Sequence, residues 1–253
     1  MITNQGRTGS ARVTQTLEVS AFRFSADPTA LVDFLSLLGL SVRVSNSAGN
    51  WYELQGAAGS ISIHGAGELG GTTAEPGTTD VIVITPDLIA LAEQLRADGN
   101  ISVDVWDEAF GRQATMTVGE RTISINEQQS DPYGYQVSDP KPGPVTVVGH
   151  CYTDDVETTR SAFAELGFAA VDPAGGPDDR IRLQASESSG VICLHPIVGG
   201  PDRYLVGLEI EQDLDAVDEL LRSAGFATRH VDTGESGIEV TDPDGQPLLI
   251  TAR

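Results

Sequence analysis

The sequence predicts an α+β protein of four β-α-β-β-β modules, which pair into two tandem domains that each form a concave trough from a mixed sheet. Two observations support this fold class. The same order of strand and helix patterns recurs at intervals of roughly 60 residues, as expected for an internal repeat. In addition, two short segments in corresponding modules have nearly the same pattern, at residues 59–65 (GSISIHG) and 190–196 (GVICLHP).

The two repeated segments predict strands that line a cleft. Each begins with glycine, alternates apolar with small residues, and carries a histidine near its end. Because successive side chains of a strand point to opposite faces, Ser62 and His64 share one face, and Cys193 and His195 share the corresponding face. The pattern therefore indicates a duplicated chain whose strands present a polar side to a cavity.

The first half of the chain contains two modules. Asp27 begins the first helix as its cap, apolar residues recur at helical spacing, and Gly39 ends the helix. The second helix begins at Asp87 and stops near Gly99, after a Gly/Thr/Pro-rich loop at 65–78. The predicted strands are 17–24, 40–44, 51–54 and 60–64 in the first module, and 80–85, 101–106, 113–118 and 121–126 in the second.

The second half repeats this order after a segment at 130–144 that holds four prolines and two glycines and has no periodicity. One helix is capped by Asp155 and ends at Gly167, and the next ends at Gly225. The predicted strands are 145–153, 168–171, 180–184 and 191–195, then 205–210, 227–231, 237–241 and 248–251. The predicted organisation is a disordered tail at 1–15, an N-terminal domain at 16–130, a linker at 131–144 and a C-terminal domain at 145–253.

Composition limits the partners. The chain has 253 residues and a formal net charge of −22, so nucleic acid and membrane surfaces are not expected partners, whereas a cationic ligand would be attracted. There is no apolar run of membrane-spanning length and no secretory signal, and a cytoplasmic location is expected. The two cysteines are too few for a disulfide framework. Cys151 is expected to be buried beneath a helix, and Cys193 to lie beside His195.

Three segments within the modules resemble a known family. They are residues 106–112 (WDEAFGR), 155–168 (DVETTRSAFAELGF) and 241–245 (TDPDG), and residues 127–135 (EQQSDPYGY) add to them. In this order, the repeated modules resemble the vicinal oxygen chelate superfamily, which includes glyoxalase I, bleomycin-resistance proteins and extradiol dioxygenases. The resemblance implies two tandem domains of that fold, a small-molecule ligand in a trough, and a monomer or homodimer. It does not fix the chemistry, because one fold hosts many functions.

The resemblance also implies a divalent metal, because enzymes of this superfamily hold one in the trough with His, Glu or Gln from the first and last strands of each module. In the C-terminal domain we predict His150, His195 and Glu209 as ligands, with Leu249 at the fourth position. This set suits Fe(II), Mn(II), Ni(II) or Zn(II) and leaves a coordination site open. If Glu209 is not a ligand, it is the predicted catalytic base. A shift of one residue in register would instead bury His150 beneath the helix.

The N-terminal domain departs from this metal-binding pattern. Ile123 stands where enzymes of the family often have Glu. His64 is expected to be a histidine at the edge of the cleft, and Asp80 is expected to cap a strand. Glu127 is expected to end a strand in solvent.

Two functions remain open from the sequence. The first is a metal-dependent enzyme of the glyoxalase or dioxygenase type, in which the metal stabilises an enediolate-like anion. The second is a metal-free binding protein, similar to bleomycin-resistance proteins, that sequesters a cationic or aromatic small molecule. The enzyme requires a metal that is lost with His150, whereas the binding protein is indifferent to chelators.

Overall fold

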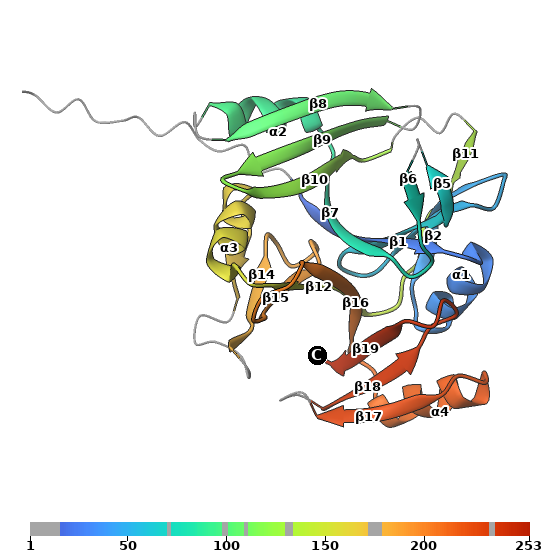
Figure 1. The fold of residues 1–253 in the computed structure, drawn as a ribbon. Helices are drawn as coiled ribbons and strands as arrows, with labels where there is room; N and C mark the ends of the chain where they lie inside the picture. The colour runs from blue at the N-terminus through green and yellow to red at the C-terminus, as the bar shows by residue number, and fades with distance from the viewer. Residues whose placement is uncertain are drawn as a thin grey trace, which may run out of the picture.

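The computed structural model describes residues 16–69, 72–97, 101–108, 111–129, 134–171, 179–232 and 236–253, and the predicted tail at 1–15 and helix end at Gly99 lie outside them. The predicted module order recurs along the chain (Figure 1). The helices are α1 (Pro28–Leu37), α2 (Leu88–Arg96), α3 (Val156–Glu165) and α4 (Leu214–Ser223). The strands of the first half are β1 (Glu18–Ser25), β2 (Ser41–Asn46), β3 (Trp51–Gln55), β4 (Ser60–Gly65), β5 (Gly67–Leu69), β6 (Thr72–Ala74), β7 (Thr79–Thr85), β8 (Ser102–Glu108), β9 (Gly111–Val118), β10 (Arg121–Glu127) and β11 (Tyr135–Val137). Those of the second half are β12 (Val145–Thr153), β13 (Ala169–Ala170), β14 (Ile181–Gln184), β15 (Val191–Pro196), β16 (Arg203–Ile210), β17 (Thr228–Asp232), β18 (Ser236–Thr241) and β19 (Pro247–Ala252).

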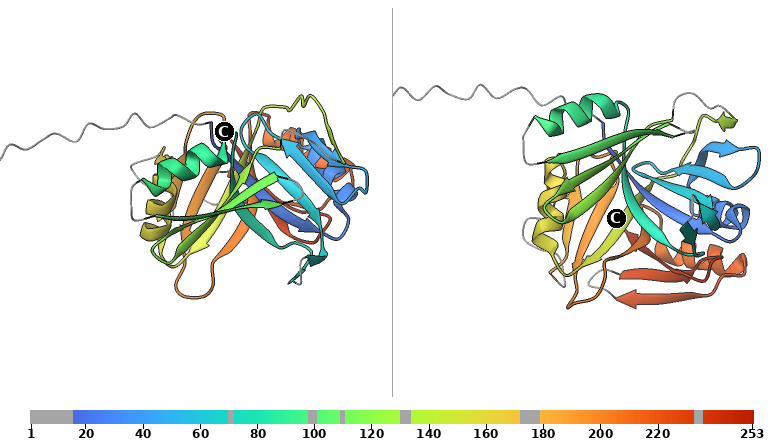
Figure 2. Two further views of the ribbon diagram at one scale, coloured as in Figure 1. Left: turned by 90° about the horizontal axis from the view of Figure 1, so that it is seen from above. Right: turned by 45° about the horizontal axis from the view of Figure 1, so that its top comes forward.

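Each pair of modules forms one mixed sheet, as the sequence predicts. Within the described residues, the first sheet has the strand order β11-β2-β3-β4-β1-β7-β10-β9-β8, and the second has β13-β14-β15-β12-β16-β19-β18-β17. The first strands of the two modules pair antiparallel at the centre of each sheet, β1 with β7 and β12 with β16. Both views in Figure 2 show strands that fan and curve, which gives each sheet a concave side.

Each described helix begins with an aspartate whose carboxylate accepts a backbone N–H of the first turn, which satisfies a donor that the helix itself leaves unpaired. The caps are Asp27, Asp87, Asp155 and Asp213. Gly39, Gly167 and Gly225 follow α1, α3 and α4 with positive φ, as expected of helix-ending glycines. Among the described helices, none is long and apolar enough to cross a membrane.

Two hydrophobic cores form on the helix side of the sheets, and each contains residues from both halves of the chain. One includes Leu91 of α2 and Phe163 of α3. The other includes Phe34 of α1 and Leu221 of α4. The ring centroids of Phe34 and Phe226 lie 4.7 Å apart. The domain boundary at 131–144 stays a prediction, but the cores cross it, so the two halves pack on each other through their helix-bearing faces.

The glycines that begin the two repeated segments meet where the halves join. Gly59 and Gly190 have φ of 75° and 76°, and a Cβ on Gly59 would lie 3.1 Å from the Cα of Gly190. Val19 and Val147 each donate a backbone hydrogen bond across the junction, at 2.6 and 2.8 Å, to the residue preceding the other half's glycine. Each contact from the first half to the second has an equivalent contact from the second half to the first. The two halves are therefore related by an approximate twofold rotation. Glycine suits both positions because a side chain would meet backbone atoms there.

Two segments that were expected to lack regular structure contain strands. The loop at 65–78 includes the hairpin of β5 and β6. The segment at 131–144 includes β11, which pairs antiparallel with residues 44–46 of β2. Without β11, β2 would be a sheet edge with unpaired N–H and C=O groups. Main-chain pairing of this kind leaves no hydrophobic pattern, so the sequence prediction missed it.

Strand register confirms the predicted facing of the central strands in the second sheet. Leu208 lies in the helix-side core, so its neighbour Glu209 faces the trough. Cys151 is buried in the other core, as predicted, and His150 faces the opposite way. In the first sheet, however, Ile123 packs in the helix-side core, so it does not stand at a trough position. The error is one residue of register, which reverses a side chain's direction.

Candidate functional site in the C-terminal trough

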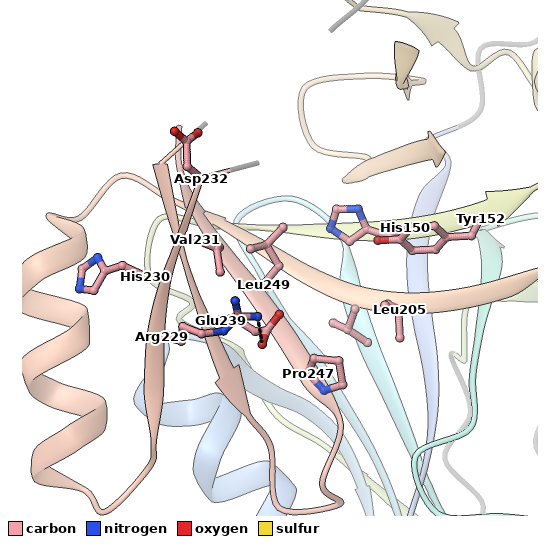
Figure 3. Close-up of a pocket in the computed structure, with 11 residues that line it drawn as sticks. His150, Tyr152, Leu205, Arg229, His230, Val231, Asp232, Glu239, Pro247 and Leu249 are labelled. Atoms are coloured by element: carbon pink, nitrogen blue, oxygen red, sulfur yellow. Dashed lines mark hydrogen bonds and ion pairs between the residues drawn. The ribbon is translucent and has the colours of Figure 1, made fainter. Parts of the chain in front are cut away.

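The trough of the second sheet contains a pocket of about 420 Å³ between β12, β16, β17, β18 and β19 (Figure 3). Leu205, Pro247 and Leu249 form its apolar part. Arg229 and Glu239 face each other on its wall, with Arg229 Nη2 2.8 Å from Glu239 Oε1. A cavity with apolar walls and a few converging polar groups suits a small molecule.

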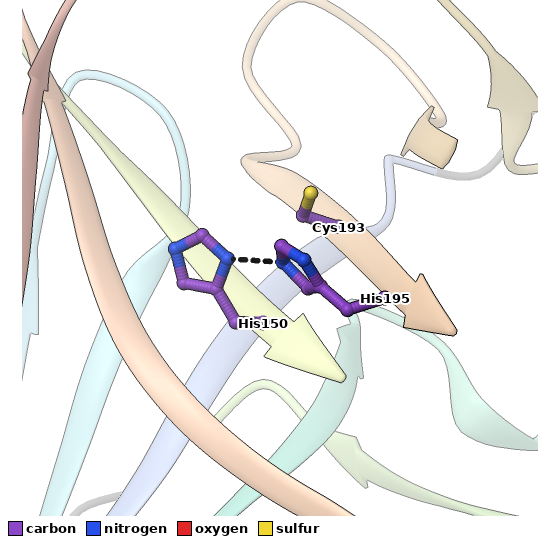
Figure 4. Close-up of side chains that lie close together, drawn as sticks. All are labelled: His150, Cys193 and His195. Atoms are coloured by element: carbon purple, nitrogen blue, oxygen red, sulfur yellow. Dashed lines mark hydrogen bonds between the residues drawn. The ribbon is translucent and has the colours of Figure 1, made fainter. Parts of the chain in front are cut away.

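His150 and His195 lie together at one end of this trough. His150 Nδ1 is 2.8 Å from His195 Nε2 (Figure 4). Parallel pairing of β12 with β15 sets His150 beside Cys193 and Tyr152 beside His195, so all four side chains share the trough face. The Tyr152 ring stacks on His195 with centroids 4.4 Å apart and an interplanar angle of 15°, which holds the His195 ring in its orientation.

Gly207 leaves the space that the His150 ring occupies. On β16 this glycine pairs with Val148 of β12, one step along the trough face from His150. A Cβ at position 207 would overlap His150 Nε2 and lie 2.8 Å from its Cδ2. Any side chain at this position would therefore move the imidazole away from His195.

Burial and positive neighbours keep His150 neutral. The side chain is 7% exposed, and burial lowers the pKa of His150 to about 3, with further lowering by His195, Arg180 and Arg182. At physiological pH the ring is an unprotonated imidazole, the form that binds metal ions. In the hydrogen bond with His195, one of the two nitrogens carries the shared proton.

Glu209 faces the trough, as predicted, but forms an ion pair with Arg182 of β14. Leu205 is the residue of β16 that pairs with His150, and Glu209 lies four residues further along the strand, about 13 Å at the usual rise per residue. The structure therefore brings His150 and His195 together and places Glu209 elsewhere in the trough. The roles predicted for Glu209, third ligand or catalytic base, stay predictions.

Cys193, rather than Glu209, lies beside the two histidines. Within the described residues, His150, Cys193 and His195 are the group whose ligand atoms all lie within 4.8 Å of one another. Two nitrogens that share a metal ion at about 2.0–2.1 Å in tetrahedral geometry stand about 3.3 Å apart. The pair at 2.8 Å would need to open by roughly half an ångström, so the donors fit a metal ion after small side-chain rotations. The sequence placed Cys193 and His195 on one face, but its meeting with His150 depends on how β12 and β15 pair.

The residues considered in the N-terminal domain have structural roles. His64 lies between Phe24 and Trp51. The centroid of its ring is 5.8 Å from the ring centroid of each of them. Asp80 Oδ1 accepts the N–H of the next residue at 2.8 Å, and burial raises the pKa of Asp80. Glu127 does not end in solvent as expected, because its Oε1 accepts the first N–H of α2 at 3.2 Å.

Comparisons with known proteins identify the fold. No family model matches the sequence, and no curated protein matches it. Among solved structures, a catechol 2,3-dioxygenase matches with a TM-score of 0.61 and 15% identity, over 92% of this chain and 86% of that one. The Mn(II)-bound glyoxalase from Novosphingobium aromaticivorans matches with a TM-score of 0.59 and 14% identity, over 95% and 82%. The 2,3-dioxygenase LapB from Pseudomonas sp. KL28 matches with a TM-score of 0.60 and 14% identity, over 93% and 91%.

The chain has the fold of the vicinal oxygen chelate superfamily. The predicted fold class and resemblance are thereby confirmed. At such low identity the likeness establishes the fold, and the chemistry has to be argued from the residues of the trough.

Proposed function

We propose that this chain binds a small molecule in its C-terminal trough and acts on it with a divalent metal held by His150 and His195. The observation that carries the proposal is the approach of His150 Nδ1 to His195 Nε2, 2.8 Å apart on the face that forms the pocket. Two imidazole nitrogens that share a proton can exchange it for a metal ion. Structures of the same fold that are named as dioxygenases and as a Mn(II)-bound glyoxalase support this class of function.

A bound divalent metal would supply Lewis-acid polarisation of substrate oxygens. The chain's own residues bind and orient the substrate. Leu205 and Leu249 exclude water from the apolar part of the pocket, which suits an aromatic or aliphatic group. Glu239 and Asp232 are carboxylates in the pocket lining, and we assign Glu239 the acceptance of a substrate proton. Glu209 contributes by holding Arg182 in the trough.

A metal-free binding protein is the second candidate. Two observations favour it: module four offers Leu249 where a family ligand was expected, and Arg180 and Arg182 place positive charge near His150. In this case the trough would sequester an aromatic molecule. The arginines argue against the cationic ligand that the net charge suggests, because the local field acts on the ligand more directly than the distant surface does.

Metal content separates the two candidates. Untagged wild-type protein, His195→Ala and His64→Ala are loaded with Mn(II), Ni(II), Fe(II) or Zn(II), passed over a desalting column and measured by mass spectrometry. His64 is the matched control because it ends the repeated segment in the other half. We expect about one ion per chain in wild type and His64→Ala, and at least a tenfold loss in His195→Ala. Wild-type protein that retains none of these ions would refute the metal-dependent function.

A further inference from the structure

We propose that Cys193 is the third ligand of this metal, as a thiolate, and that the site therefore prefers a thiophilic ion such as Zn(II) to Mn(II). The inference rests on the proposed function and adds to it the sulfur ligand and the class of metal. Cys193 is fully buried and stands next to His150 in the register of β12 and β15. Its Sγ and the two imidazole nitrogens lie within 4.8 Å of one another, and Figure 4 shows the sulfur beside the two rings.

The identity of the three donors determines the preference. One sulfur and two imidazole nitrogens suit Zn(II), Co(II) or Cd(II), whereas Mn(II) and Mg(II) favour oxygen ligands. The carboxylate that would supply such an oxygen, Glu209, is paired with Arg182. Three protein ligands around Zn(II) leave a fourth position for substrate or water, the arrangement of catalytic zinc sites.

Charge favours the thiolate as well. Arg180 and Arg182 place positive charge near His150, which opposes the entry of a divalent cation. When the metal–sulfur bond forms, the thiol releases its proton to solvent and the sulfur brings one negative charge to the ion. The bound unit of metal and thiolate then carries one positive charge instead of two, so it is less strongly repelled than the bare ion. A site made of the histidines alone would not have this compensation.

Cobalt spectroscopy provides the test. Co(II) is added to wild-type protein, Cys151→Ala and Cys193→Ser, and the near-ultraviolet region is examined for the charge-transfer band that a thiolate–cobalt bond produces. Cys151→Ala is the matched control, because Cys151 is equally buried on the neighbouring strand but faces the helix-side core, and its removal leaves Cys193 as the single thiol. We expect the band with equal intensity in wild type and Cys151→Ala, and none in Cys193→Ser.

Competition between Zn(II) and Mn(II) gives a second measurement. Cys193→Ser should lower the preference for Zn(II) over Mn(II) by about tenfold or more, because a hydroxyl replaces the soft ligand. Cobalt that binds at one equivalent without the charge-transfer band would refute Cys193 as a ligand and leave the proposed function standing. Absence of cobalt and zinc binding in wild-type protein would overturn the thiolate ligand, and the proposed function would fall with it only if Mn(II), Ni(II) and Fe(II) are not retained either. Circular dichroism of each variant verifies that the fold is retained.

Discussion

The two troughs share a backbone and differ in what fills them. In the first sheet Phe22 pairs with Ser62, and in the second His150 pairs with Cys193, at corresponding points of the parallel pairs β1–β4 and β12–β15. The histidine that ends each repeated segment is present in both halves. One half therefore carries three adjacent metal-ligand side chains, and the other carries a phenylalanine, a serine and one histidine.

The two troughs also differ at one position on the strand beside this pair, where the second half has Gly207 and the first half has Ile82. Gly207 leaves the space that the His150 ring occupies, whereas Ile82 is the residue at the corresponding point of β7 and is buried. The ring centroids of Phe22 and Trp51 lie 5.7 Å apart in the first trough. The pocket beside Trp51 holds only about 20 Å³, against about 420 Å³ in the second trough. A few residues on one strand face thus decide whether this frame holds a cleft or a packed interior.

The charged residue at one corresponding position also differs in sign between the troughs. Glu53 pairs with Ser62 in the first sheet, and Arg182 pairs with Cys193 in the second. Glu53 forms a buried ion pair with Arg43, whose side chain is 12% exposed. Each trough therefore holds an Arg–Glu ion pair, but the glutamate lies beside Ser62 in the first sheet and the arginine lies beside Cys193 in the second.

The largest effect that this contrast predicts concerns Arg43. Arg43→Met would leave Glu53 buried without its cation and close to Glu18, whose pKa is raised by burial and then by Glu53. We expect a loss of about 3–5 kcal/mol in the free energy of unfolding, measured by urea denaturation, with no change in metal content. The double variant Arg43→Met/Glu53→Gln should recover most of this loss, because Glu53, the carboxylate that pairs with Arg43, no longer carries a charge. A change below about 1 kcal/mol in the single variant would mean that water reaches the first trough.

The next effect should separate the troughs by function. Gly207→Ala places a Cβ against His150 Nε2, so the imidazole must leave its position beside His195. We expect the affinity for Zn(II) to fall about 10–100-fold, measured by competition with a chromophoric chelator. The matched variant Ile82→Ala should cost about 2–5 kcal/mol of stability by opening a cavity but leave metal affinity unchanged. Unchanged affinity in Gly207→Ala would exclude His150 from the metal site.

The features of this contrast that depend on local patterns can be predicted from the sequence. Alternation along β15 and β16 gave the facing of His195 and Glu209, and aspartate caps gave the helix starts, because these features are set within a few residues. The partner of Glu209 could not be predicted in this way. Arg182 lies on β14, separated from β16 by two strands, and its ion pair depends on the reach of a long side chain across the trough.

Relations between distant strands explain the other omissions. Cys193 was predicted to share a face with His195, but its proximity to His150 follows from the pairing of β12 with β15, which brings together residues more than 40 positions apart. Strand register over such a separation is set by the packing of the whole sheet. The filling of the first trough by Phe22 and Ile82 is non-local for the same reason, since the two residues come from different modules.

The smallest predicted effect concerns Asp80. It pairs with Phe22 in the first sheet, and Leu205 pairs with His150 at the corresponding point of the second. Burial raises the pKa of Asp80, so the folded protein favours the protonated carboxyl. A raised pKa stabilises the fold at low pH, and this contribution is lost as the pH rises through the folded-state pKa. Asp80→Asn keeps the side-chain oxygen that accepts the Val81 N–H and removes the charge. At pH 7 we therefore expect it to be more stable than wild type by up to about 1 kcal/mol.

This gain should shrink as the pH falls and vanish below the unfolded-state pKa of about 3.9, when Asp80 is protonated in both states. Asp155 provides a control of opposite sign, because hydrogen bonds from Thr158 at the start of α3 lower its pKa. Asp155→Asn should be less stable than wild type at pH 7, and this difference should also close at low pH. Melting temperatures of the three proteins between pH 7 and pH 3.5 measure both trends. If Asp80→Asn destabilises at pH 7, the carboxylate is paired in the folded protein, which would contradict the expected gain.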